Sequence, residues 1–326
     1  MNRRDFLQTM GLAAAGLAGA PSAFSSSVPA PWFDISLAEF SFASDLFTGK
    51  MNHLDFPMIA RRDYGIGIVE YVAMFFNGKE TDPAYIKELK KRAADAGVRN
   101  HLIMVDGENI ADLDSGKRAH AVESHYHWVD VANELGCTSI RVNLGALDQE
   151  GSAEEVGKAA VEGYSKLLEF GQKNKMNIIV ENHIGHSCNG QWLSGVMRQV
   201  NHPRAGTLPD FGNFCVRRTK PATQDIAGYM ATTCLEEYDK YKGVEELMPY
   251  AKGVSAKSHR FTSDGNDQDV DFFRMFDIIR KSGFRGIVGI EYEGGIMQMG
   301  GKTGYPNNSE GVRATLSLLE KIRNAG

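Results

Sequence analysis

Apolar and polar positions along the chain alternate between two patterns. Short runs rich in β-branched and other apolar residues recur along the chain and are typical of strands buried on both faces of a parallel sheet. They cover residues 33–42, 65–75, 100–106, 138–144, 176–183, 206–213, 253–259 and 286–293. Between them lie stretches whose apolar residues follow helical spacing. These cover residues 82–96, 117–135, 153–173, 189–200, 243–250, 270–281 and 309–323.

Eight strands alternating with helices predict a single (β/α)8 TIM barrel, an α/β fold, over residues 29–326. A doubly wound sheet is the alternative, but no GxGxxG motif follows the first predicted strand. In a TIM barrel the active site lies where the strands end at their carboxyl termini. The polar residues at or near those ends are Glu39, Glu70, Asp106, Glu181, Asp210, His259 and Glu291.

The first 28 residues do not follow this alternation. Arg3 and Arg4 precede Phe6 and Leu7, and a short run rich in Ala, Gly and Leu follows, ending in small residues around Ala20. Paired arginines, a short apolar region and a small-residue cleavage site are the parts of a twin-arginine export signal. The apolar run is too short to span a bilayer. We therefore predict residues 1–28 to be an export signal and leader, with no membrane anchor and a periplasmic or exported product.

Composition and charge narrow the class of protein. The chain is 42% hydrophobic and 24% charged, as expected for a globular protein with a full core. A net charge of -5 gives no basic face for nucleic acid, which argues against such a partner. The four cysteines lack the CxxC spacing of a zinc site, and in an oxidising compartment one pair could form a disulfide. They are Cys137, Cys188, Cys215 and Cys234.

Four of the strand-end residues are metal ligands by type. Glu181 ends NIIVE, Asp210 ends GTLPD, His259 ends GVSAKSH and Glu291 ends GIVGIE. Carboxylates suit hard divalent ions, and a single imidazole shifts the preference from calcium toward transition metals. The pattern predicts one divalent metal ion, with Mn2+ as the first choice and Mg2+, Co2+, Fe2+ or Zn2+ as alternatives.

The segments IIVENHIGHSCNGQWL, NHPRAGTLPDFGNF, KGVSAKSHRF and GIVGIEYEG resemble the xylose-isomerase-like TIM barrel superfamily. The resemblance covers nearly all of the mature chain. This superfamily includes sugar isomerases and epimerases, inosose dehydratase and type IV apurinic endonucleases. The resemblance implies that Glu181, Asp210, His259 and Glu291 hold one ion, and that Glu181 and Glu291 transfer protons on opposite faces of the substrate. An ion bound to a carbonyl and a neighbouring hydroxyl would stabilise the enediolate.

Two positions depart from the family pattern. Asn213 stands where the epimerases often have a histidine, and an amide can bond a sugar hydroxyl but cannot transfer protons near neutral pH. Lys257 and His259 alternate onto one face of their strand. Either Lys257 points inward as a cation for an enolate oxygen beside the ligand His259, or His259 points elsewhere. The expected substrate contacts are Glu70, Asn143, His183, Trp192, Asn213 and Lys257.

Structural roles compete with these assignments. Glu181 and Glu291 could pair with Arg141 or Lys257 inside the barrel, and Asp210 could shape a turn. The insertion at 216–242 and the glycine-rich loop at 294–305 could cover the site, and the loop could instead form an oligomer contact. The histidines of the predicted helix 117–135 are expected on its solvated face; they are His120, His125 and His127.

Three functions follow from the predicted site. The first is a metal-dependent isomerase or epimerase of a free sugar, polyol or keto-sugar, since exported proteins rarely meet sugar phosphates. The second is a lyase or dehydratase that eliminates a β-substituent from a keto-glycoside or keto-polyol through the same enolate. The third is a non-catalytic sugar-binding barrel. An apurinic endonuclease is disfavoured because it would need more ligands and a basic face. The expected partner is a small sugar, and a homo-oligomer is compatible with this family.

Overall fold

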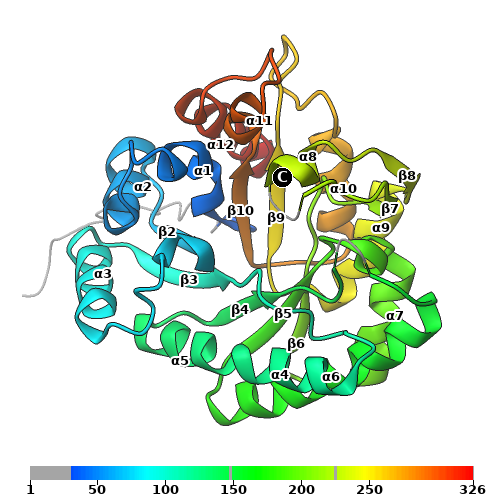
Figure 1. Ribbon diagram of the computed structural model, residues 1–326. Coiled ribbons are helices and arrows are strands. Elements are labelled where there is room, and N and C mark those ends of the chain that lie inside the picture. Colours follow the sequence, from blue (N-terminus) through cyan, green and yellow to red (C-terminus); the bar gives the residue numbers. More distant parts are fainter. Residues whose placement is uncertain (1–30, 147–148, 224–225, 326) are drawn as a thin grey trace, which may run out of the picture. The chain divides into compact units, whose positions relative to one another are not determined.

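The computed structural model describes residues 31–146, 149–223 and 226–325. The predicted export signal lies outside the described residues. Eight parallel strands form one sheet in the order β6-β5-β4-β3-β2-β1-β10-β9 (Figure 1). Their bounds are β1 (Asp34–Ala38), β2 (Ile68–Val72), β3 (Arg99–Met104), β4 (Ser139–Val142), β5 (Asn177–Glu181), β6 (Ala205–Leu208), β9 (Val254–Ser258) and β10 (Ile287–Tyr292).

Two isolated parallel bridges join the edge strands β6 and β9, pairing Thr207 with Ala251 and Asp210 with Ser255. The backbone N–H of Ser255 donates to the carbonyl of Pro209 at 2.9 Å. The sheet thereby closes into a barrel, and the prediction of a (β/α)8 barrel is confirmed. Closure also places Asp210, which follows β6, directly beside β9.

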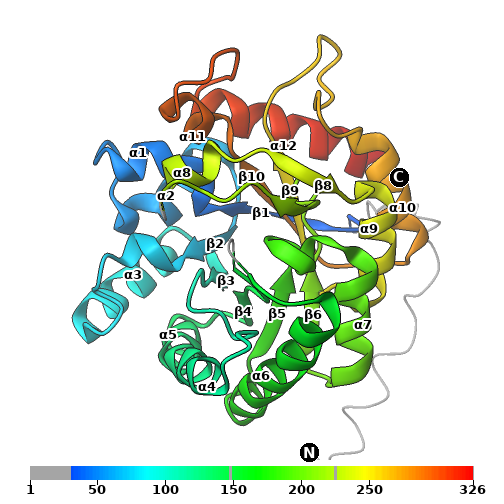
Figure 2. The same cartoon turned by 45° about the vertical axis from the view of Figure 1, so that its right-hand side comes forward.

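Helices surround the barrel and follow the strands in turn (Figures 1 and 2). The long helix α6 begins with a capping box, in which Ser152 and Glu155 satisfy each other's backbone N–H groups. The helices are α1 (Ala43–Phe47), α2 (Phe56–Tyr64), α3 (Pro83–Asp95), α4 (Ser115–Ser124), α5 (Tyr126–Leu135), α6 (Ala153–Lys173), α7 (Gly190–Val200), α8 (Ile226–Met230), α9 (Lys240–Leu247), α10 (Phe272–Lys281), α11 (Gly294–Met299) and α12 (Asn308–Ala325). Among the described residues, no helix has both the length and the apolar composition needed to cross a membrane.

Each strand presents alternate residues to the interior of the barrel and to the helices. Leu102, Met104 and Ile179 belong to a small apolar cluster inside the barrel. The larger cluster, which includes Ile178 and Val180, lies between the strands and the helices. Val72 and Met104 end β2 and β3, and Phe75 and Ile296 lie in segments after β2 and β10, so the small cluster lies toward the carboxyl ends of the strands, beside the polar side chains of the mouth.

The predicted helix 117–135 is two helices. Chain direction changes between α4 and α5 at His125, which is buried and bonds through Nδ1 to the carbonyl oxygen of Ala121 at 2.6 Å. The expectation that His125 is solvated was therefore wrong, because the helix junction turns its ring inward. Helices α1 and α2, after β1, were not predicted, because residues 43–64 lack a long apolar period.

The predicted insertion at 216–242 contains an antiparallel hairpin of β7 (Cys215–Arg218) and β8 (Cys234–Glu237), with α8 between its strands. A disulfide joins Cys215, the first residue of β7, to Cys234, the first residue of β8, whereas Cys137 and Cys188 are buried free thiols. Helix α8 lies over one end of the barrel (Figures 1 and 2). Met230 at its end packs against the apolar cluster inside the barrel, so the insertion covers part of the mouth.

Candidate active site

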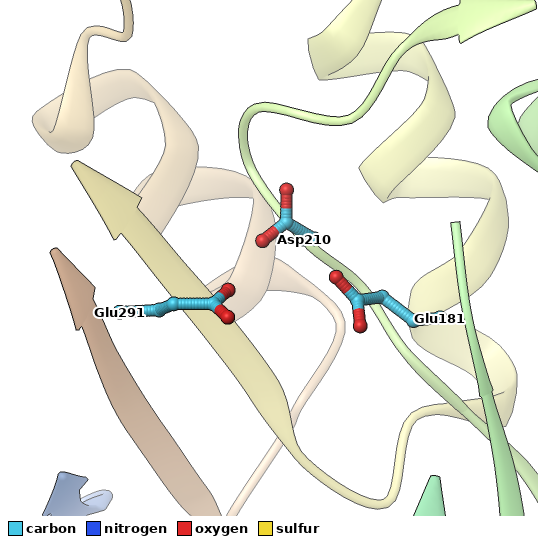
Figure 3. Close-up of side chains that lie close together, drawn as sticks. All are labelled: Glu181, Asp210 and Glu291. Atoms are coloured by element: carbon cyan, nitrogen blue, oxygen red, sulfur yellow. The ribbon is translucent and has the colours of Figure 1, made fainter. Parts of the chain in front are cut away.

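Three buried carboxylates converge at the mouth of the barrel. Glu181 ends β5, Asp210 follows β6, and Glu291 lies near the end of β10. One oxygen from each residue lies within 4.8 Å of the others, and the three side chains point toward one another (Figure 3). We refer to Glu181, Asp210 and Glu291 as the carboxylate cluster. The structure thus brings together three of the four predicted metal ligands.

Asp210 is held by its own loop. Its Oδ1 accepts hydrogen bonds from the backbone N–H groups of Gly212 and Asn213, at 2.8 and 2.9 Å. Its backbone N–H donates to Oδ1 of Asn182 at 2.8 Å. Asp210 therefore shapes a turn and also keeps its second oxygen, Oδ2, directed into the barrel. The structural and functional interpretations of this residue are compatible.

Ser255 links two members of the carboxylate cluster. Its hydroxyl lies 2.8 Å from Oδ2 of Asp210 and 2.8 Å from Oε2 of Glu291. A hydroxyl carries one proton, so it can donate to only one of these oxygens at a time. Sequence reasoning missed Ser255, although it lies two residues before Lys257 and therefore on the same face of β9.

The Lys257 ammonium lies beside the carboxylate cluster. Nζ is 3.6 Å from Oδ2 of Asp210, 3.5 Å from Oε2 of Glu291 and 2.9 Å from Oε1 of Glu293. Burial would lower the pKa of Lys257, but the surrounding carboxylates outweigh burial and raise it well above its usual value. Lys257 is thus the positively charged member of the site contributed by β9.

His259 lies outside the carboxylate cluster. Its Nε2 is 3.3 Å from Oε2 of Glu293, and its backbone N–H donates to Oδ2 of Asp267 at 2.9 Å. The reason is positional, since β9 ends at Ser258 and the chain turns toward Asp267 before the imidazole can reach the cluster. The structure combines one part of each arrangement expected for β9. Lys257 points inward, as in the first, and His259 lies outside the cluster, as in the second.

Glu293 is a second residue that sequence reasoning missed. It lies two positions after Glu291, so strand alternation places both side chains on the same side. Burial would raise the pKa of Glu293, but the charge of Lys257 and the hydrogen bond from His259 hold it well below its usual value. Glu293 is therefore an anion that contacts both Lys257 and His259 at the end of β9. The sequence EYE contained this signal.

Arg141 connects the cluster to the ends of β3 and β4. Its Nε lies 2.8 Å from Oε2 of Glu181, and its Nη1 bonds Asp106. Asn143 also donates to Asp106, at 3.0 Å. The expected pairing of Glu181 with Arg141 is therefore present, and it orients the carboxylate rather than removing it from the cluster. Asn143 lies at the mouth but bonds Asp106 rather than the cluster.

Asn213 and His183 lie beside Glu181. Asn213 donates from Nδ2 to Oε1 of Glu181 at 3.0 Å. Burial lowers the pKa of His183 to about 4, so its imidazole is neutral near pH 7, with a buried Nδ1 that no protein group bonds among the described residues. Both predicted substrate contacts therefore offer a neutral polar group next to the carboxylate cluster.

Glu70 and Trp192 lie away from the cluster. Glu70 is buried inside the barrel and accepts a hydrogen bond from Ser36 at 2.6 Å. It lies over Gly289, where a Cβ atom would come within 2.9 Å of its carboxylate. Trp192 donates from its indole to the carbonyl oxygen of Ala153 at 2.7 Å. The structure therefore gives Glu70 a supporting position beneath the mouth and gives Trp192 a packing role on α7.

A cavity of about 530 Å3 adjoins the mouth. It is bounded by the loops that follow β4, β5 and β6, including Gln149, His186 and Asn189, and by Arg217 and Arg218 of the hairpin. These loops continue from the strands and turns that carry Asn143, His183 and Asn213. The cavity therefore lies among the loops on the β4 to β6 side of the mouth, and no member of the carboxylate cluster lines it.

The electrostatics of the carboxylate cluster follow from burial and from its own negative charge. Burial raises the pKa of Glu181 to about 7, while Arg141 opposes the shift and Glu291 adds to it. Burial likewise raises the pKa of Asp210 well above its usual value, with the charge of Lys257 opposing. Three carboxylates in one buried space share an excess of negative charge, which favours either protons or a cation.

The carboxylate cluster fits a divalent ion by its donor chemistry. Three carboxylates on three different strands or strand ends can direct oxygen atoms to one point, and oxygen ligands suit Mg2+ and Mn2+. Each member also has a supporting contact, from Arg141, from the turn after Asp210, or from Ser255. The carboxylate cluster could therefore hold a divalent ion.

Comparisons with known proteins agree with the fold. The family described as xylose isomerase-like TIM barrel matches residues 60–322. No curated protein sequence matches the chain.

Solved structures of similar fold include an epimerase, a zinc protein and a dehydratase. D-allulose 3-epimerase from Methylomonas sp. is 14% identical, with 90% of this chain and 99% of that chain covered and a TM-score of 0.63. The IolI protein with a bound zinc atom is 11% identical, with coverage of 90% and 99% and a TM-score of 0.68. The probable 3-DHS dehydratase AsbF from Bacillus anthracis is 13% identical, with coverage of 88% and 99% and a TM-score of 0.60. Identities this low show a shared fold, and the family match shows that the chain belongs to the xylose isomerase-like TIM barrel family.

Proposed function

We propose that this protein is a divalent-metal-dependent isomerase or epimerase of a sugar or keto-sugar. The observation that carries the proposal is the carboxylate cluster, in which Glu181 and Glu291 come from opposite sides of the barrel mouth and point toward each other (Figure 3). Glu181, Asp210 and Glu291 would hold the ion. When bound, the ion would polarise the substrate carbonyl and stabilise negative charge beside it. An all-oxygen cluster favours Mn2+ or Mg2+ over zinc.

The side chains of the protein would carry out proton transfer and substrate binding. Glu181, oriented by Arg141 and Asn213, would remove the proton from the carbon next to the carbonyl. Glu291, held by Ser255, would return a proton to the opposite face or to the neighbouring carbon. The neutral imidazole of His183 would bond a substrate hydroxyl. Tyr229 on α8 is half-buried, and α8 would limit the access of water to the mouth.

Elimination is the second candidate reaction. It would begin with the same proton removal by Glu181, but a β-substituent would leave before a proton returns. Two observations support elimination as a candidate. The fold is similar to that of a probable dehydratase, and the cavity beside the mouth has room for a departing group.

One experiment tests the proposal and separates the two reactions. The full chain with Mn2+ is incubated in D2O with a panel of keto-hexoses and keto-disaccharides, and the products are followed by NMR. A stereoisomer or positional isomer carrying deuterium supports the isomerase or epimerase. Release of water or of a sugar unit supports the elimination. Recovery of every substrate without deuterium would contradict both.

We also propose, from the sequence alone, that the protein is exported. The paired arginines at Arg3 and Arg4 and the short apolar run motivate it. N-terminal sequencing of the mature protein from its own cells tests it. A first residue between about positions 21 and 29, after the small residues around Ala20, supports export, and an intact Met1 would contradict it.

A further inference from the structure

We propose that Lys257 is an internal cation of the carboxylate cluster that competes with the divalent ion, and that it keeps its ion pair with Glu293 while it moves away from Asp210 and Glu291 when the ion binds. The inference rests on the proposed metal site and adds what controls its affinity. Lys257 would thereby set how tightly the protein binds its ion.

The position of the ammonium group is the first argument. Nζ of Lys257 faces Oδ2 of Asp210 at 3.6 Å and Oε2 of Glu291 at 3.5 Å. These oxygens belong to two of the three residues that would hold the ion. The lysine is only 3% exposed, so water cannot screen its charge as it would at the surface. A bound dication and the ammonium group would therefore repel each other strongly.

The charge balance is the second argument. Three buried carboxylates without a counter-ion would carry a large desolvation cost. Arg141 already bonds Glu181 and Asp106, which leaves Lys257 as the described cation in contact with Asp210 and Glu291. Without a bound ion, Lys257 thus supplies positive charge next to the three carboxylates. A bound ion would supply that positive charge itself.

The contact with Glu293 is the third argument. Nζ is closest to this residue, at 2.9 Å, and Glu293 lies outside the cluster. A lysine has a flexible stem of four carbons, so a small rotation keeps this ion pair while moving Nζ away from Asp210 and Glu291. Glu293 therefore holds the ammonium group in a way that is compatible with a bound ion.

The test measures Mn2+ binding to the full chain by isothermal titration calorimetry, without any sugar. Lys257→Met keeps the length of the side chain and removes its charge. We expect Mn2+ to bind this variant at least about ten-fold more tightly than the wild type, because a nearby like charge is lost. Lys252→Met is the matched control. Lys252 precedes β9 at the opposite end of the barrel, and its substitution should leave the affinity unchanged.

A second variant keeps the proposal testable if Lys257→Met folds poorly without an ion. Glu293→Gln leaves both the lysine and the carboxylate cluster in place but removes the negative charge that would hold Nζ away from Asp210 and Glu291. We expect it to bind Mn2+ at least about ten-fold more weakly than the wild type. In the double variant, the effect of Glu293→Gln should shrink, because no ammonium group remains to be relocated.

The outcomes separate this inference from the proposed function. Equal or weaker Mn2+ binding by folded Lys257→Met, or an effect of Glu293→Gln that persists in full without Lys257, would overturn the inference even if the protein exchanges deuterium into a keto-sugar. Tighter binding by Lys257→Met would support it even if no keto-sugar reacts, and the failure would then belong to the proposed function.

Discussion

Glu181 combines the contacts that a proton-transfer residue needs. Arg141 and Asn213 fix its two oxygens, and burial raises its pKa to about 7. Replacing it with Gln keeps its shape but removes both the charge and the proton acceptor. General acid–base catalysis contributes about 10²–10⁴-fold, so kcat/KM should fall by that factor. Glu169→Gln, on the exposed face of α6, is the control and should retain full activity. A Glu181→Gln enzyme within a few-fold of wild type would remove Glu181 from the mechanism.

Glu70 makes stability depend on pH in a predictable direction. Burial raises its pKa to about 7, against an ordinary value of 4.5. Between these pH values the folded protein keeps a proton that the unfolded chain releases, so the free energy of unfolding falls as pH rises from 4.5 to about 7. The loss is on the order of 3 kcal/mol.

Urea unfolding at pH 5 and pH 8 measures this effect. Glu70→Gln cannot ionise and can still accept the hydrogen bond from Ser36. We expect the variant to lose less stability than the wild type between the two pH values. Equal losses would show that Glu70 does not ionise across this range in the folded protein.

The three members of the carboxylate cluster could be predicted from residue type and from their position at the ends of apolar runs. Glu181, Asp210 and Glu291 could be assigned because each ends an apolar run. Ser255 was missed because a hydroxyl carries little signal by its type, and Glu293 was missed although the alternation in EYE places it on the same side as Glu291. His259 was expected as a fourth ligand, but the end of β9 at Ser258 depends on the turn toward Asp267, which no local pattern reveals.

At the scale of elements, the barrel strands were easier to predict from the sequence than the helices and the hairpin that connect them. All eight barrel strands lie within the predicted apolar runs or within one residue of them, because strands buried on both faces need continuous apolar sequence. The break between α4 and α5 was missed because His125 is buried by its neighbours rather than by its own helical period. The hairpin β7–β8 was expected only as an insertion, since its strands are short and largely exposed.

The disulfide between Cys215 and Cys234 should hold the hairpin in place. It links residues 19 positions apart in the chain, and removing such a link frees the segment between them to open locally. Reduction should therefore speed trypsin cleavage at Arg217 and Arg218. Limited proteolysis followed by mass spectrometry measures the change, and Cys234→Ser should behave like the reduced wild type. Cleavage at equal rates before and after reduction would show that the hairpin is held by other contacts.

At the scale of the whole molecule, barrel closure assembles the carboxylate cluster. Asp210 reaches the cluster because the bridge between Asp210 and Ser255 closes the sheet. An ion bound there would join residues from β5, β10 and the segment after β6, and so would stabilise the folded state against the unfolded one. At 100 times its Kd, an ion adds about 2.7 kcal/mol.

Thermal unfolding in EDTA and in saturating Mn2+ checks this linkage. We expect Mn2+ to raise the Tm by a few degrees, as follows from the size of the domain. Asp210→Asn removes one ligand charge and should abolish most of the shift. An equal shift in this variant would mean that Mn2+ binds elsewhere.

The most direct test of the central claim is deuterium incorporation from D2O into a keto-sugar by the full chain with Mn2+. The carboxylate cluster predicts deuterium at the carbon next to the carbonyl, at a rate that falls about 10²–10⁴-fold in Glu181→Gln. A keto-sugar that binds measurably but takes up no deuterium would contradict the claim, and would indicate a sugar-binding barrel without proton-transfer chemistry.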